Sequence, residues 1–255
     1  MELKEKVAVI TGGASGLGEA TANEILANGG KVGILDVDED RGKAFEEKSG
    51  GNAIFMLTDV TDEESVQKAM DAVVQKFGAI HVAVNCAGIA TPGKVVGKKG
   101  PLPLATFNKV VQINLVGTFL VMQRALEKMM ENEPNEDGER GVVINTASVA
   151  AFEGQIGQAA YASSKAGVMG MTLPCAREFA QVGVRVLCIA PGIFWTPMMA
   201  GLPEKAQEAL SQMMPFPKRM GQPAEYAKLV RSLVENAYIN GETIRLDAAI
   251  RMAAK

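Results

Sequence analysis

A tyrosine and a lysine stand four residues apart in the second half of the chain, at Tyr161 and Lys165. In a helix this spacing places the phenol and the ammonium group on one face. A free tyrosine has a pKa of about 10, so work as a base near neutral pH requires a downward shift of roughly 2 to 3 units, which a neighbouring ammonium favours. The same pair is also typical of an ordinary helix surface. It predicts acid–base chemistry only together with other polar groups.

Two such groups precede the pair. Ser148 follows directly on the apolar run 142–146, and its hydroxyl would hold a substrate oxygen at the edge where open α/β sheets bind ligands. Asn114 interrupts an apolar helical pattern, where an amide must find a partner or lower stability. For Asn114, a role in the site and a structural role in the core both stay open.

A glycine-rich turn, Thr11 to Gly18, follows the first apolar run, and a helical pattern begins inside it. Its key positions are Gly12, Gly16 and Gly18. Such a turn lets backbone N–H groups approach a diphosphate at a helix N-terminus. The order of strand, turn and helix therefore predicts dinucleotide binding rather than an ordinary turn.

Asp36 ends the second apolar run, where a carboxylate accepts hydrogen bonds from the adenosine ribose and repels a 2′-phosphate. Neither Ser15 nor Val37 supplies a cation for such a phosphate, so the predicted cofactor is NAD rather than NADP. A plain turn carboxylate is the alternative. The small residues Asn85 to Gly88, after the fourth run, would let the backbone approach a ligand or simply form a turn.

In order and spacing, these motifs resemble the short-chain dehydrogenase/reductase family over essentially the whole chain. The resemblance is carried by Thr11 to Gly18, Asp59-Val60, Asn85 to Gly88, Asn114, Ser148, Tyr161, Lys165 and Pro191-Gly192. Within the family, segments 145–155, 157–161, 202–205, 215–221 and 240–252 resemble the 3-hydroxyacyl-CoA dehydrogenase type 2 group, also called 17β-hydroxysteroid dehydrogenase type 10.

The resemblance implies a catalytic role for four residues. Tyr161 would be the general acid/base, Lys165 would lower its pKa and bind the nicotinamide ribose, Ser148 would orient the substrate, and Asn114 would hold a relay water. It also implies the cofactor-binding residues Gly12, Ser15, Gly16, Leu17, Gly18, Asp36, Asp59, Val60, Asn85, Ala87, Gly88, Tyr161, Lys165, Pro191, Gly192 and Thr196. A homotetramer is implied as well, which suits the apolar C-terminal segment 244–252.

Three positions depart from this resemblance. His81 stands where relatives usually carry Asp, Trp195 where the group has a small residue, and Ala248 where glycine follows the Asp. We expect His81 to be a neutral structural residue. Trp195 would either narrow the acyl pocket or pack under it.

Seven short apolar runs alternate with helical patterns, which is typical of parallel strands covered on both faces. The expected fold is α/β: a single-domain, Rossmann-type, doubly wound parallel sheet of seven strands with helices on both faces. The strands are expected at 7–11, 31–35, 54–57, 82–85, 142–146, 184–190 and 243–246, and the helices at 18–28, 63–77, 107–130, 159–180 and 224–235. Segments 91–103 and 191–223 are expected to be loops, the second a substrate lid with a short helix near 203–212, and 131–140 a solvated connection.

The composition of the 255 residues narrows the function classes. A net charge of −3 disfavours nucleic-acid and acidic-membrane binding. One histidine and three scattered cysteines give no metal-ligand spacing and no disulfide framework. The apolar run 7–10 lies too close to the N-terminus for a targeting peptide, and no apolar run reaches about 18 residues, so we expect a cytoplasmic protein that does not bind membranes.

The expected reaction is NAD-dependent oxidation of a secondary alcohol, most simply a short or branched 3-hydroxyacyl-CoA, to the ketone. Lys98 and Lys99 would meet CoA phosphates or form a solvated loop tip. One alternative is a steroid or other hydrophobic alcohol dehydrogenase. Another is a dinucleotide-binding scaffold or RNA-processing subunit, against which the acidic composition and the intact Ser148, Tyr161 and Lys165 argue.

Overall fold

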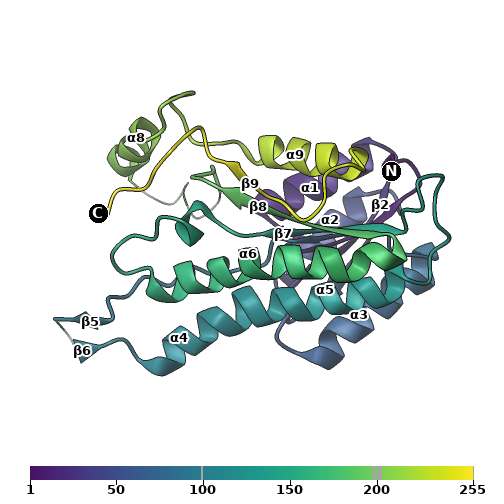
Figure 1. Cartoon of the computed structure of the whole chain (residues 1–255), viewed down its shortest axis with the longest axis horizontal. Helices are drawn as coiled ribbons and strands as arrows, with labels where there is room; N and C mark the ends of the chain where they lie inside the picture. The colour runs from purple at the N-terminus through teal and green to yellow at the C-terminus, as the bar shows by residue number, and fades with distance from the viewer. Residues whose placement is uncertain (99, 197–198, 200–202, 255) are drawn as a thin grey trace.

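A parallel seven-stranded sheet forms the centre of the molecule in the computed structural model, which describes residues 1–98, 100–196, 199 and 203–254 (Figure 1). The strand order is β3-β2-β1-β4-β7-β8-β9. The bounds are β1 Val7–Thr11, β2 Lys31–Asp36, β3 Ala53–Leu57, β4 Val82–Asn85, β7 Gly141–Thr146, β8 Val184–Pro191 and β9 Thr243–Leu246. Every residue of β1, β4, β7 and β8 is buried, which explains their continuous apolar character.

Helices cover both faces of the sheet (Figure 1). One face carries α1 (Gly16–Ala27), α2 (Glu39–Lys48) and α9 (Pro223–Glu235). The other carries α3 (Glu63–Phe77), α4 (Leu104–Val111), η1 (Gln112–Val116), α5 (Gly117–Met129) and α6 (Ala159–Phe179). The expected doubly wound α/β fold is therefore confirmed.

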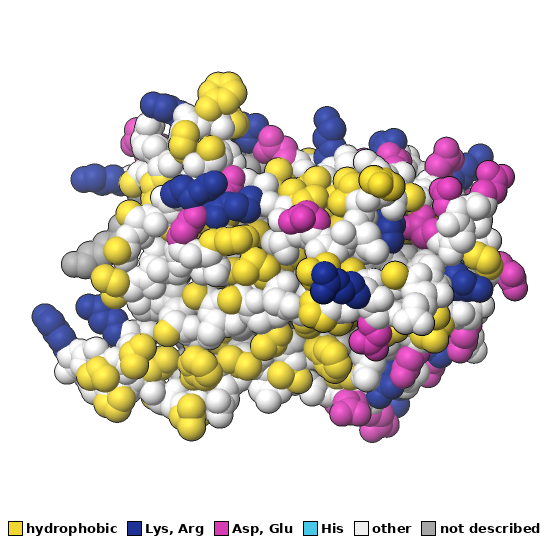
Figure 2. All heavy atoms as spheres, viewed as in Figure 1, with side chains coloured by type: hydrophobic (Ala, Val, Ile, Leu, Met, Phe, Trp, Pro, Cys, Tyr) yellow, Lys and Arg dark blue, Asp and Glu magenta, His cyan; other side chains and the backbone are white. Residues whose placement is uncertain are grey.

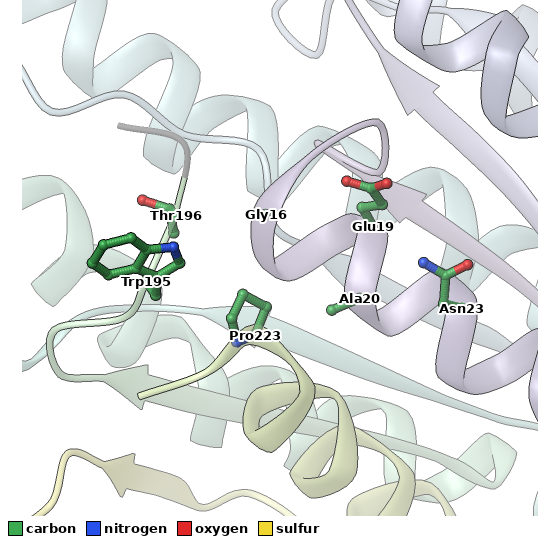
Figure 3. Close-up of a pocket in the computed structure, with 7 residues that line it drawn as sticks. All are labelled: Gly16, Glu19, Ala20, Asn23, Trp195, Thr196 and Pro223. Atoms are coloured by element: carbon green, nitrogen blue, oxygen red, sulfur yellow. The ribbon is translucent and has the colours of Figure 1, made fainter. Parts of the chain in front are cut away.

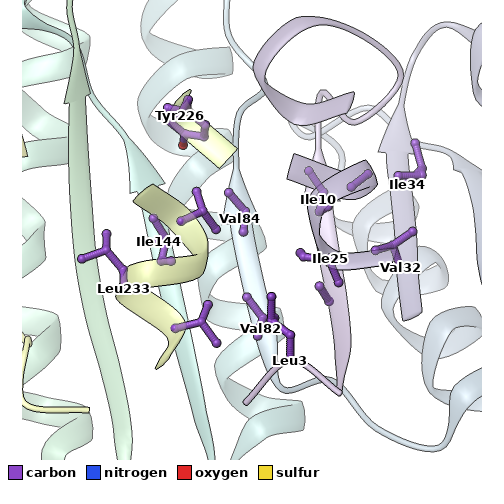
Figure 4. Close-up of a cluster of buried hydrophobic side chains, with 14 of the residues drawn as sticks. Leu3, Ile10, Ile25, Val32, Ile34, Val82, Val84, Ile144, Tyr226 and Leu233 are labelled. Carbon is purple, nitrogen blue, oxygen red and sulfur yellow. The ribbon is translucent and has the colours of Figure 1, made fainter. Parts of the chain in front are cut away.

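The core consists mainly of two apolar layers, one on each face of the sheet. On the α1 and α9 face, Ile25 and Leu233 pack against Ile10, Val84 and Ile144 (Figure 4). The α3 helix shows how the sequence specifies the second layer. Its apolar residues recur at helical spacing, Asp62 caps its first turn by accepting the Glu64 N–H, and Gly78 ends it with φ 90°.

The strand order reverses between β1 and β4, the position at which open α/β sheets bind ligands beyond the carboxyl ends of their strands. The glycine turn follows β1, and residues 85–88 end β4. The two loops touch: Ala87 N–H donates to Thr11 Oγ1 at 3.1 Å. The sheet topology thus brings together two segments that lie about 75 residues apart.

Three features differ from the sequence-based expectation. No helix was expected at α2, a polar helix in which Gly42 lies against the Phe55 ring. The expected loop 91–103 contains a hairpin of β5 (Val96–Gly97) and β6 (Gly100–Pro101). Segment 131–140 is not wholly solvated, because Glu139 is 8% exposed and pairs with buried Arg185 at 2.7 Å.

Residues 104–129 form a continuous helix that is long and apolar enough to cross a membrane, with a mean hydropathy of 1.3 and 33% of the window buried. The sequence holds no unbroken apolar run of that length. In this fold α4 contacts α6, and α5 contacts α3 and the sheet, as core helices of globular proteins do.

Candidate active site

Ser148 and Tyr161 lie beyond the carboxyl end of β7. Ser148 caps the short η2 helix (Val149–Ala151), its Oγ accepting the Ala150 N–H at 3.1 Å, and it is 9% exposed. Tyr161 lies in the first turn of α6. Burial raises the pKa of Tyr161, while a hydrogen bond with Ser148 acts in the opposite direction. The two hydroxyls are therefore close enough to act on one substrate oxygen.

Lys165 lies one turn further along α6 and is 4% exposed. Its Nζ donates to the Thr146 carbonyl at 2.7 Å. Burial lowers the pKa of Lys165 to about 8, while the neighbouring thiols of Cys188 and Cys86 act in the opposite direction. An ammonium has three donors, so Lys165 keeps two for other partners.

That Lys165 lowers the pKa of Tyr161 stays a prediction, because the shift of the tyrosine in this structure has two other causes. The tyrosine pKa is raised because burial of the phenol outweighs the favourable hydrogen bond from Ser148. Burial penalises the charged form of both groups, so the tyrosine pKa rises and the lysine pKa falls.

Asn114 lies in the π-helical turn η1, a distortion that is frequent at functional sites. Its Oδ1 accepts the Ile89 N–H at 2.8 Å, and its Nδ2 donates to the Ile89 carbonyl and to Ser164 Oγ. Thr118 Oγ1 donates to the Asn114 carbonyl at 2.8 Å. Since both amide hydrogens are used inside the protein, the side chain fixes the loop after β4 against α6.

Gly88 shows how closely these groups converge. A Cβ atom at Gly88 would lie 3.2 Å from Asn114 Oδ1 and 3.4 Å from Lys165 Nζ. A larger residue would therefore fill the space between the amide and the ammonium group. The fold brings Gly88, Asn114 and Lys165 to one point from three separate parts of the chain.

The glycine turn is tightly packed against its surroundings. Gly12 has φ 64°, and a Cβ there would lie 2.9 Å from the Ala87 nitrogen. A Cβ on Gly18 would overlap the Gly12 carbonyl. Ser15 caps α1 in extended conformation without a side-chain capping bond, and Leu17 packs against the core. The turn thus leaves backbone N–H groups at the start of α1, as a diphosphate site requires.

Asp36 braces the glycine turn from the end of β2. Its Oδ2 accepts the Ala14 N–H at 2.9 Å, and its Oδ1 accepts the Asp38 N–H at 3.0 Å. Val37 beside it is 70% exposed. The position combines a fixed carboxylate with an exposed apolar side chain, which suits a ribose and an adenine ring.

The other expected cofactor residues occupy different environments. Asp59 is exposed after β3, where it accepts two hydrogen bonds from Thr61, and Val60 is 8% exposed. Asn85 is 2% exposed and donates to Asn145 across the sheet, so we interpret it as a residue that fixes the loop. Pro191 ends β8, and Gly192 donates to the Leu246 carbonyl at 2.9 Å.

Thr196 lies at the beginning of the expected lid. It lines a pocket of about 400 Å³ together with Gly16, Trp195 and Pro223 (Figure 3). The short helix expected near 203–212 is confirmed as α8 (Glu204–Gln212). Positions 197, 198 and 200–202 of the expected lid, and Lys99, lie outside the described residues.

Comparison with known proteins supports the interpretation of this site as that of a dehydrogenase. Residues 6–207 match the family model described as short chain dehydrogenase. The chain belongs to the short chain dehydrogenase family. It is therefore an oxidoreductase.

Individual relatives match this short chain dehydrogenase over nearly their whole length. It is 53% identical to 3-hydroxyacyl-CoA dehydrogenase type-2 of Homo sapiens, covering 98% of this chain and 97% of the relative, and 48% identical to that of Drosophila melanogaster, covering 98% and 99%. The crystal structure of 3-hydroxyacyl-CoA dehydrogenase type-2 from Mycobacterium avium matches with a TM-score of 0.94 and 41% identity, covering 98% of this chain and 97% of that one.

The three departures have distinct surroundings in this dehydrogenase. His81 Nδ1 accepts the Val7 N–H at 3.2 Å, and burial with the charge of Lys6 lowers its pKa to about 4, as expected of a neutral structural histidine. Ala248 has φ 49°, a conformation that favours glycine. Trp195 faces α1 and Pro223 across the pocket.

The sequence did not predict the residues that fix the site residues in place by hydrogen bonds. The Thr146 carbonyl anchors Lys165, and the Ile89 backbone and Ser164 anchor Asn114. Tyr226 of α9 is fully buried, and its hydroxyl lies 2.7 Å from Thr146 Oγ1. A hydroxyl on the apolar face of a helix was the available signal, because a buried phenol needs a partner.

Proposed function

We propose that this protein catalyses the NAD-dependent oxidation of a short or branched 3-hydroxyacyl-CoA to the 3-ketoacyl-CoA. The observation that carries the proposal is the convergence of Ser148, Tyr161 and Lys165 at the carboxyl edge of the sheet, beside a glycine turn braced by Asp36. Acid–base groups and a dinucleotide cradle at one edge are what hydride transfer from an alcohol requires.

Each residue has a role that follows from its position. Ser148 orients the substrate hydroxyl toward Tyr161, whose phenolate oxygen takes the hydroxyl proton as the carbonyl forms. Lys165 is anchored on the Thr146 carbonyl and directs its remaining donors to the ribose. Asn114 holds residues 88–89 in place, and its Oδ1 retains a lone pair for a relay water.

The residues of the turn fit NAD. Gly12 and Gly18 leave no room for side chains, so a diphosphate can approach the N-terminus of α1. The Asp36 carboxylate is placed to accept ribose hydroxyls and to repel a 2′-phosphate. When bound, NAD supplies the acceptor for the hydride that leaves the carbinol carbon, and its ring supplies the positive charge that favours a Tyr161 phenolate.

The relatives named as 3-hydroxyacyl-CoA dehydrogenases support an acyl-CoA substrate, and two features of the structure support it as well. Lys98 is exposed at the tip of the β5–β6 hairpin, which projects from the end of the molecule that also carries α8 (Figure 1). An apolar cluster rich in methionine, including Met213, Met214, Met220 and Met252, joins the lid to the C-terminal segment. Methionine side chains adapt to flexible apolar groups such as acyl chains.

We further propose that the protein forms a homotetramer through the helical face of α4, α5 and α6. Apolar side chains gather along this side of the molecule (Figure 2). Leu104, Phe119 and Leu173 are 71%, 47% and 45% exposed. A second copy of the same face would cover them, since large exposed apolar areas mark association sites.

The substrate is tested by following NADH formation from NAD with 3-hydroxybutyryl-CoA, 2-methyl-3-hydroxybutyryl-CoA and a steroid alcohol. We expect kcat/KM to be highest for one of the two CoA thioesters. Turnover of the steroid alone would support the alternative alcohol dehydrogenase. A salt-dependent gel shift with RNA and no turnover of any alcohol would support the scaffold.

A further inference from the structure

The backbone of Trp195 is hydrogen-bonded at the start of the proposed lid. Its backbone N–H donates to the Gly221 carbonyl at 2.7 Å, next to a parallel bridge between Phe194 and Gly221. Phe194 is buried and packs edge-on against Tyr226 of α9, with ring centroids 6.5 Å apart. The backbone that leads into Trp195 is thereby attached to the core.

The indole lines the same pocket as Gly16, the first residue of α1. Besides Trp195, the pocket wall comprises Gly16, Glu19, Ala20, Asn23, Thr196 and Pro223, from α1, the lid and the start of α9. In Figure 3 the nitrogen-bearing edge of the indole is turned toward Gly16 at the beginning of α1. Ser148 and Tyr161 are not among the residues of this wall.

The charges and hydrogen-bond donors of the residues that line this pocket indicate where an anion would bind. Within the described part of the chain, the indole N–H has no hydrogen-bond acceptor, and the side chain is 37% exposed. Glu19 and Asn23 line the same pocket further along α1, and the Glu19 carboxylate disfavours a second anion beside it. The favourable place for a phosphate is the rim formed by Gly16, Thr196 and Trp195, where the positive end of α1 and two donors meet.

We propose that Trp195 is a cofactor-binding residue that covers the diphosphate and donates its indole N–H to a phosphate oxygen. This inference rests on the dinucleotide-binding function proposed above. The ring covers one side of the bound diphosphate, and the N–H supplies a charge-assisted hydrogen bond to it.

The test uses nucleotides that differ in phosphate number. Calorimetry gives Kd for NAD, ADP and AMP with the wild type, Trp195→Phe, Trp195→Gly and the control Tyr238→Ala. Phe retains the ring without the donor, whereas Gly removes both. Tyr238 is 99% exposed after the opposite end of α9. The protein contains a single tryptophan, so quenching of its fluorescence by acrylamide reports on position 195 alone.

For the diphosphates NAD and ADP, we expect Trp195→Phe to raise Kd about fivefold and Trp195→Gly about tenfold or more, with AMP affinity changed less than twofold. We also expect saturating NAD to reduce acrylamide quenching of the wild type, and Tyr238→Ala to bind all three nucleotides as the wild type does. Equal diphosphate affinities in all variants, with unchanged quenching, would overturn the inference while leaving the NAD function intact. A wild type that binds none of these nucleotides would overturn the NAD function and the inference with it.

Discussion

Burial is the dominant electrostatic effect on the individual residues of this site. It raises the pKa of Tyr161 and lowers that of Lys165 to about 8, so both groups favour their neutral forms more than in water. The sequence spacing predicts that the two side chains lie together, but not how deeply they are buried. Their charge states therefore depend on tertiary structure that spacing alone does not contain.

His81 provides a prediction about pH and stability. Its pKa is about 4 in the folded chain and about 6.5 when unfolded, so the unfolded state binds more protons between these values. Stability is fully present above pH 6.5 and is lost as pH falls toward 4. Because the side chain is partly exposed, we expect a loss of about 2 kcal/mol in urea unfolding between pH 7 and pH 4.5. His81→Asn, which retains an acceptor, should flatten this dependence. An equally steep profile in the variant would assign it to other groups.

Asp36 provides a prediction about cofactor choice. Asp36→Asn removes the charge that we propose repels a 2′-phosphate, so we expect any preference for NAD over NADP to fall about tenfold in kcat/KM. Asp38→Asn is the matched control, because Asp38 caps α2 by accepting the Arg41 N–H and should not affect the preference. An unchanged preference in Asp36→Asn would show that another residue excludes the phosphate.

Among the elements, those with clear periodicity are well predicted from the sequence and the polar ones are not. The seven strands lie where expected, and the α3 bounds agree exactly at Glu63–Phe77. The α2 helix was not predicted from the sequence because Gly42 is its only buried residue. The helix therefore has no apolar face that periodicity could reveal. The π-helical turn at Asn114 was not predicted either, because the apolar residues around Asn114 have the spacing of an ordinary helix.

The segment after β9 contains a strained position that can be tested. Ala248 has φ 49°, where a Cβ is disfavoured, so Ala248→Gly should stabilise the protein by about 0.5 to 1 kcal/mol. Ala72 lies in the middle of α3, and Ala72→Gly should destabilise it by about 1 kcal/mol. Urea unfolding of both variants measures the difference. Destabilisation by both substitutions would mean that residue 248 is not strained.

At the scale of the whole molecule, buried ion pairs are the part of the fold least visible in the sequence. Glu139 lies in a polar run that reads as solvent-exposed, yet it pairs with Arg185, which also donates to the carbonyls of Leu233 and Val234. Each of these partners lies 46 to 49 residues from Arg185 along the chain. A charge pattern read locally does not reveal such a pairing.

The proposed assembly makes a prediction about mass in solution. Phe119 is 47% exposed on α5, within the apolar face assigned to the subunit contact. Phe119→Glu places like charges opposite one another in a symmetric interface, so we expect light scattering to report dimers or monomers in place of tetramers. Tyr238→Glu is the control for added charge and should leave the mass unchanged. A Phe119→Glu variant with the wild-type mass would show that the interface lies elsewhere.

The proton-transfer role of Tyr161 is the central claim, and the rate of NADH formation from NAD and 3-hydroxybutyryl-CoA tests it most directly. The account predicts that Tyr161→Phe lowers kcat/KM by about a thousandfold, while the Kd for NAD measured by calorimetry changes less than threefold. A variant that retained turnover within about threefold of the wild type would contradict the proposed mechanism.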